Sequence, residues 1–274
     1  MQGRLYAVGA VAVLGAVSIA APATAAETPA AASLSVLHGV PDLTVDVYVN
    51  GALTLDDFAP GELAGPLELP AGAYQLAVTA ADAADASAPL IGPVDVTLAA
   101  GGNYTATANL DAGGTPTANF YTNDVSTVEA GKSRLTVRHV ATAPAVDVLA
   151  GGAVLVPNLS NPGEASLTTD AGTVSAAVAA TGTTDPVIGP ADVALAEGTS
   201  TIVYAWGSLE AGNLALATQV IDGLHSSPGA VPGGQSGLAA QDDNGAAIGI
   251  GAFLLVLLGG AVAASRRRAT RISS

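Results

Sequence analysis

Two histidine–aspartate pairs are the residues of this 274-residue sequence whose types and spacing come closest to a reactive site. The spacing between His38 and Asp46 recurs between His139 and Asp147. A carboxylate that orients an imidazole prepares a general base in hydrolytic enzymes and fixes the tautomer of a histidine in metal sites. These four residues therefore form the candidate polar site of the sequence.

The surrounding pattern favours a structural role for the histidines over a catalytic one. His38 shares strand parity with Leu34 and Val36, so it is expected to point inward at a strand end. A histidine at such a place commonly bonds its nitrogens to backbone carbonyls or to a nearby carboxylate. Asp46 and Asp147 alternate with valines, which predicts that both carboxylates face solvent on the opposite side.

Other signals of catalysis are missing from the sequence. It contains no cysteine, no Gly-x-Ser-x-Gly elbow, no His-Glu-x-x-His helix and no phosphate-binding loop. Acidic groups that bind calcium weakly or are simply solvated are Asp56-Asp57, Asp82 with Asp85, and Asp242-Asp243. None has the spacing of a dedicated calcium loop. We predict that the protein is not an enzyme and needs no cofactor or metal.

The charge is distributed unevenly along the chain. All 23 acidic residues lie between Glu27 and Asp243, where the basic residues are only Lys132, Arg134 and Arg138. Such a surface repels nucleic acid, whose binding needs Lys and Arg to neutralise phosphates. The acidity is also typical of an exposed protein that stays soluble. We expect the three basic residues to pair with acidic groups at the junction of two domains and to set the angle between them.

The elements that position these residues are predicted to be strands. Residues 34–38, 45–49 and 74–78 alternate between apolar and polar with period two. Asn50-Gly51 is the commonest dipeptide of a tight hairpin, and Gly101-Gly102 marks a further turn. Gly and Pro punctuate the chain and no helical period is visible. The pattern predicts an all-β fold built as an antiparallel β-sandwich, Ig-like or Greek-key-like.

A duplicated phrase shows that this unit occurs twice. IGPVDVTLAAG at residues 91–101 returns as IGPADVALAEG at residues 188–198, and the window that begins at Ser33 aligns with the one at Arg134. A period of about 100 residues indicates duplicated domains rather than a solenoid of short repeats. We predict two tandem β-sandwich domains, at residues 33–128 and 134–224.

The two ends of the chain read as delivery and anchoring segments. Residues 1–26 have the charge, the apolar run and the Ala-x-Ala site of a signal peptide. Residues 226–244 are rich in Gly, Pro, Ser and Gln, which suits a stalk. Residues 246–264 are uncharged and long enough for one transmembrane helix, and the arginines of residues 265–274 belong on the cytoplasmic side.

These segments predict a single-pass protein of the cell membrane with an extracellular ectodomain and a cytoplasmic tail. A sortase substrate ends in a similar way, but the Leu-Pro-x-Thr-Gly motif is missing. The lack of cysteine is also common in exported proteins of alanine-rich actinobacterial proteomes.

Motifs of the first half resemble the DUF4397 family of bacterial exported domains. They are His38, Pro41, VDVYVNG at residues 45–51, LPAGAY at 69–74 and AGGNYT at 100–105. The second half keeps His139 and the Val-Asp-Val strand but has Leu149 and Val174 in place of two tyrosines, so it resembles the family more distantly. The resemblance implies an exported β-sandwich in the cell envelope. The family has no established activity, so it implies no site residue.

The function predicted is that of a non-enzymatic cell-surface protein in adhesion, envelope organisation or ligand display. Its partners would be the membrane and a cell-envelope polymer or surface protein, with no nucleic acid. The alternative is an envelope-associated module that binds a small molecule or glycan, with calcium as an aid. An enzyme that uses the His–Asp pairs is a third hypothesis.

Overall fold

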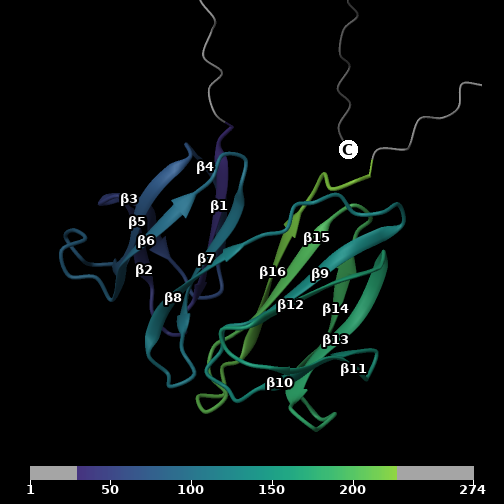
Figure 1. Cartoon of the computed structure of the whole chain (residues 1–274). Helices are drawn as coiled ribbons and strands as arrows, with labels where there is room; N and C mark the ends of the chain where they lie inside the picture. Colours follow the sequence, from purple (N-terminus) through teal and green to yellow (C-terminus); the bar gives the residue numbers. More distant parts are fainter. Residues whose placement is uncertain (1–29, 227–274) are drawn as a thin grey trace, which may run out of the picture. The chain divides into compact units, whose positions relative to one another are not determined.

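The computed structural model describes residues 30–226, which contain sixteen β-strands and no helix (Figure 1). The first half contains β1 (Ala32–Gly39), β2 (Val45–Val49), β3 (Ala52–Phe58), β4 (Leu63–Leu69), β5 (Gly72–Ala80), β6 (Ile91–Leu98), β7 (Asn103–Leu110) and β8 (Pro116–Thr122). The second half contains β9 (Lys132–His139), β10 (Val146–Ala150), β11 (Ala153–Leu159), β12 (Glu164–Asp170), β13 (Gly172–Ala180), β14 (Pro186–Leu195), β15 (Ser200–Trp206) and β16 (Ala215–Ile221). The all-β class is confirmed for the described part of the chain.

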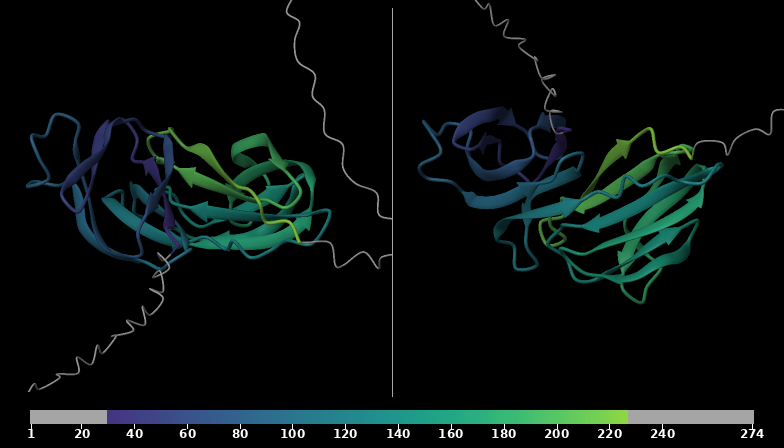
Figure 2. Two further views of the ribbon diagram at one scale, coloured as in Figure 1. Left: turned by 90° about the horizontal axis from the view of Figure 1, so that it is seen from above. Right: turned by 45° about the horizontal axis from the view of Figure 1, so that its top comes forward.

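Each half forms two four-stranded sheets with the same plan. The first has the strand orders β4-β1-β7-β8 and β3-β2-β5-β6, and the second has β12-β9-β15-β16 and β11-β10-β13-β14. Figure 2 shows the strands of the two halves as separate groups. In each half, one apolar core takes side chains from both sheets, such as Leu34 and Val78 in the first and Leu135 and Val178 in the second. This is the layer arrangement of a β-sandwich.

The prediction of a wholly antiparallel sandwich is wrong at one strand pair in each half. β1 runs parallel to β7, with Leu34 opposite Tyr104, and β9 runs parallel to β15. Between β1 and β7 the chain visits the other sheet twice, through β2–β3 and β5–β6. This long connection brings β7 back in the direction of β1. Side-chain alternation has the same period in parallel and antiparallel strands, so the sequence pattern does not distinguish them.

The hairpin predicted at Asn50-Gly51 is confirmed. β2 and β3 pair on either side of it, with Val49 opposite Ala52. Both turn residues have left-handed backbone angles, with φ of 50° at Asn50 and 77° at Gly51. Asn and Gly tolerate this conformation best, which is why the dipeptide marks the turn.

The duplicated phrase marks a backbone irregularity. Gly92 in β6 and Gly189 in β14 have φ of 91° and 87°, and the pairing register shifts beside each. A Cβ atom on Gly92 would lie 2.7 Å from the carbonyl oxygen of Leu76, and one on Gly189 would lie 2.8 Å from that of Ala176. Only glycine fits at both places. The most similar stretch of the two halves therefore contains a glycine that the backbone of each half requires.

Several sequence predictions fall outside the described residues. These are the signal peptide at 1–26, the stalk at 226–244 except Ser226, the transmembrane helix at 246–264 and the tail at 265–274. Within residues 30–226, no helix has the length and apolar character needed to span a membrane.

Candidate functional site

His38 lies at the end of β1 and is fully buried. Its Nε2 atom lies 2.6 Å from the carbonyl oxygen of Leu43, and its Nδ1 atom lies 3.4 Å from the backbone nitrogen of Val40. A backbone N–H can only donate, so Nδ1 accepts and Nε2 carries the proton. The ring also stacks on Phe58, with 5.7 Å between the ring centroids. The imidazole is therefore neutral and fully engaged by its own strand and the following loop.

His139 repeats this arrangement in the second half. Its Nε2 donates to the carbonyl oxygen of Pro144 at 3.1 Å, and its Nδ1 accepts from the N–H of Ala141 at 3.3 Å. Burial lowers the pKa of both histidines below the usual value, and the backbone carbonyls at Leu43 and Pro144 offset part of this effect. Both rings are thus held in the neutral form.

The prediction that Asp46 and Asp147 face solvent is wrong. Only 3% of Asp46 and 5% of Asp147 is exposed. Asp46 Oδ1 accepts the N–H of Asp57 at 2.9 Å, and Asp147 Oδ1 accepts the N–H of Asn158 at 2.8 Å. The physical reason is a shift in strand pairing between β2 and β3, and likewise between β10 and β11, which folds the neighbouring edge strand towards the carboxylate.

The residues that donate to these carboxylates share an unusual backbone conformation. Asp57 has φ of 52° and Asn158 has φ of 53°, a left-handed conformation that Asp and Asn adopt more readily than other residues with side chains. Asp147 also accepts the N–H of Gly182 at 2.9 Å through Oδ2. The hydrogen bonds from Asn158 and Gly182 lower the pKa of the Asp147 carboxyl. The recurring aspartates therefore fasten an irregular edge strand.

The structure does not join the histidines to the aspartates. In residues 30–226, the hydrogen bonds of His38 and His139 go to backbone groups, and those of Asp46 and Asp147 go to other backbone groups. An imidazole whose two nitrogens are both occupied has no lone pair with which to act as a general base or to bind a metal. The geometry thus supports structural roles for all four residues.

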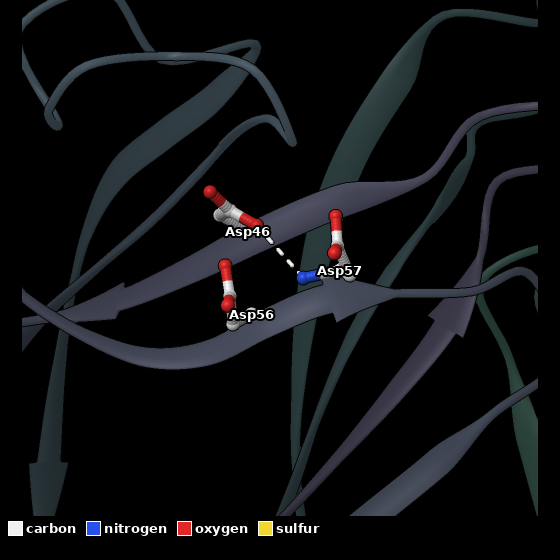
Figure 3. Close-up of side chains that lie close together, drawn as sticks. All are labelled: Asp46, Asp56 and Asp57. Atoms are coloured by element: carbon white, nitrogen blue, oxygen red, sulfur yellow. Dashed lines mark hydrogen bonds between the residues drawn. The ribbon is translucent and has the colours of Figure 1, made fainter.

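A cluster of carboxylates lies on the first half where the sequence shows only an acidic pair (Figure 3). Ligand atoms of Asp46, Asp56 and Asp57 lie within 4.8 Å of one another, with Asp46 buried and the other two exposed. Carboxylate oxygens are the ligands that Ca²⁺ prefers. In β11 the corresponding positions hold Pro157 and Asn158, so the second half has no matching cluster.

The other acidic pairs add nothing to this cluster. Asp82 and Asp85 lie exposed in the turn after β5, where Asp85 accepts the N–H of Ser87 at 2.9 Å. The hydrogen bonds from Ser87 lower the pKa of the Asp85 carboxyl. The pair at residues 242–243 lies outside the described residues.

The basic residues at the junction form ion pairs, as predicted. Lys132 contacts Asp170 at 2.7 Å, Arg134 contacts Asp124 at 3.2 Å and Arg138 contacts Glu164 at 2.8 Å. Arg134 also donates to the carbonyl oxygens of Asp124 and Ser126, so it holds the segment that links the two halves. Every basic side chain of the described part of the chain is therefore neutralised.

Arg138 connects the two halves. It is 1% exposed, and its guanidinium donates to the Tyr204 hydroxyl at 2.9 Å and to Asn123 Oδ1 at 2.8 Å. It also lies over the ring of Tyr121, 4.2 Å from the centroid. Tyr121 lies in β8 of the first half and Asn123 follows that strand, whereas Tyr204 and Arg138 belong to the second half. One buried cation thus holds side chains from both sides of the junction.

Gln219 extends this network into the first half. Its Oε1 accepts from the hydroxyls of Tyr204 at 2.6 Å and Thr105 at 3.0 Å, and its Nε2 donates to Ser35 Oγ at 3.1 Å. All these side chains are buried. The sequence pattern does not single out Gln219, because an uncharged polar residue in an alternating strand resembles a solvent-facing one. Only the folded structure places the Gln219 side chain against Ser35 of β1 and Thr105 of β7.

Comparison with known proteins gives a family match and a structural neighbour. No curated protein matches the sequence. The solved structure described as "The Bacillus anthracis TIE protein" is similar at 14% identity, covering 64% of this chain and 33% of that chain, with a TM-score of 0.19. This chain therefore spans about a third of that protein. Residues 32–149, from β1 into β10, match the family model described as "Domain of unknown function (DUF4397)", which confirms the resemblance of this stretch.

Proposed function

We propose that the protein is a non-enzymatic cell-surface protein that displays two tandem β-sandwiches in adhesion, envelope organisation or ligand display. The observation that carries this proposal is the hydrogen bonding of His38 and His139. In both halves, the ring nitrogens of the histidine best suited to catalysis form hydrogen bonds with backbone groups. A residue that the fold repeats for the same structural purpose needs no catalytic explanation.

We also propose that the second half is a divergent copy of the DUF4397-like first half. The two halves share their strand orders, their parallel central pair and the position of the glycine bulge. Divergence in the edge strands then explains why Asp56 and Asp57 of β3 correspond to Pro157 and Asn158 of β11.

The proposed location is the cell membrane, with the sandwiches outside and the basic tail inside. The signal-peptide pattern at residues 1–26 and the apolar run at 246–264 support it. The test is protease treatment of intact cells that carry the chain with a tag after Ser274. Loss of residues 30–226 from the membrane fraction, with the tag protected, is expected. Recovery of the whole chain from the cytosol would contradict the proposal.

The non-enzymatic role is tested by a broad screen for hydrolase activity on the full chain. No turnover above a heat-treated sample is expected. Turnover that disappears in a folded His38→Gln or His139→Gln variant would overturn the proposal, because it would show that these rings act on a substrate.

A second candidate is calcium-dependent binding of a small molecule or glycan, which the cluster of Asp46, Asp56 and Asp57 favours. Calorimetry with calcium chloride tests it. A heat signal that fits a single binding site would support this candidate if it vanishes in Asp56→Asn but persists in the exposed control Asp82→Asn. Equal signals in both variants would mean only diffuse binding to an acidic surface.

A further inference from the structure

A groove runs between the two halves along two strands that are each at the edge of a sheet. Its volume is about 310 Å³, which is within the range of ligand sites in proteins. β4 ends one sheet of the first half and β16 ends one sheet of the second. The lining residues are Ser35, Leu63, Gly65, Pro66, Asn103, Thr218, Gln219, Val220, Ile221 and Asp222.

The lining shows that the groove follows the edge of β16 rather than one of its faces. Five consecutive residues, 218–222, contribute to it. Successive side chains of a strand point to opposite faces, so a run of neighbours can line a groove together only along the edge. Among the described residues β16 pairs with β15 alone, which leaves the backbone groups of its other edge without strand partners.

The floor of the groove is fixed by the network at the junction. Gln219 of the second half donates a hydrogen bond to Ser35 of the first half. Asn103 Oδ1 accepts a hydrogen bond from Asn123 Nδ2 at 2.7 Å. Asn123 is in turn bonded to the buried Arg138. A groove whose floor is already ordered loses little entropy when a ligand binds.

The charge around the groove selects a basic occupant. Asp222 is the only charged residue in the lining. Lys132, Arg134 and Arg138 are all engaged in ion pairs, so the described surface offers no free cation to a ligand, while most of its acidic groups stay unpaired. The unpaired acidic groups give this surface a negative electrostatic potential, which favours the approach of positively charged partners.

We propose that this groove binds an extended, basic polypeptide segment of another protein, which pairs with the free edge of β16. Strand addition of this kind draws its affinity from backbone hydrogen bonds and its specificity from side chains at alternate positions. This proposal specifies a partner for the adhesive or display role. It rests on that proposed function only in taking the partner to be a surface protein. The binding itself is a property of residues 30–226.

The experiment uses the full chain and three synthetic peptides. The probe is Lys-Thr-Val-Thr-Val-Thr-Lys, the charge control has Glu at both ends, and the pairing control carries N-methyl groups on alternate residues. We expect the Lys peptide to bind with a dissociation constant between about 1 µM and 1 mM. Both controls should bind at least about tenfold more weakly, because one is repelled and the other cannot pair.

Amide NMR shifts locate the binding, and a pair of charge reversals tests it. Perturbations are expected in residues 218–222 and in β4. Asp222→Lys should weaken binding of the Lys peptide about tenfold or more, whereas Asp192→Lys, an equal change on the exposed face of β14, should leave it within about twofold. The inference is overturned if the peptide binds at another edge, if both variants behave alike, or if the groove responds only to a neutral polysaccharide or to a second copy of the chain. Any of these results leaves the protease test of location untouched.

Discussion

Each ring nitrogen of His38 meets a backbone group within hydrogen-bond distance, and each ring nitrogen of His139 does the same. Their recurrence therefore reflects a repeated way of closing the end of a strand against the next loop. The aspartates recur for a related reason, because each accepts an N–H from an edge strand that bulges towards it. At the residue scale, similar spacing of His and Asp arises from two independent backbone contacts.

The buried histidines predict a loss of stability in mild acid. Burial lowers the pKa of both in the folded state. Below about pH 6.5 the unfolded chain therefore binds protons that the folded chain does not, and the free energy of unfolding falls until the folded pKa is passed. Denaturant unfolding at pH 8 and pH 5 measures this change.

The exposed His225 provides the control for that experiment. His225→Gln should keep the full loss of stability between pH 8 and pH 5, whereas a folded His38→Gln variant should lose part of it. Stability that does not change with pH, or that depends on His225, would show that the buried rings are not the cause.

At the element scale, the turns were predictable from sequence and the strand directions were not. Asn50-Gly51 predicts its turn because both residues tolerate positive φ, which is a local property of the sequence. The parallel pairing of β1 with β7 depends on where the chain goes in between, which no local pattern records. The burial of Asp46 was missed for a similar reason, because the bulge that covers it belongs to the neighbouring strand.

The glycine bulge gives a prediction for β6. Gly92→Ala places a Cβ against the Leu76 carbonyl at a φ of 91° and should destabilise the fold by about 2 to 4 kcal/mol. Gly72→Ala is the matched control in β5, because its Cβ would meet nothing nearer than 3.9 Å. Urea unfolding measures both. Equal effects would show that the repeated phrase is not a backbone requirement.

At the scale of the whole molecule, the junction joins the two sandwiches through buried polar groups. The sequence pattern indicates the basic residues of this junction, because three cations stand out in an acidic stretch of the chain. The pattern does not single out Gln219 or Asn123, which gain their partners on the other half only in the folded chain. The sequence pattern does not reveal the candidate groove either, since residues of β4 and β16 line it together only in the folded chain.

The junction predicts unequal effects for two basic residues of β9. Arg138→Leu removes a buried cation bonded to Tyr204, Asn123 and Glu164, and should cost about 2 to 4 kcal/mol of stability. Lys132→Met breaks an exposed ion pair on the same strand and should cause no resolvable change. Denaturant unfolding compares them. A larger loss for Lys132 would contradict the described junction.

The central claim is that the recurring histidines serve the fold in both halves, and NMR titration of His38 and His139 tests it most directly. The full chain is titrated with and without zinc or calcium, and the ring signals are followed. We predict a pKa below about 6.5 for both rings and no response to either metal. Accessible titration at the usual value, with shifts on adding metal, would contradict the account and restore the histidines as a site.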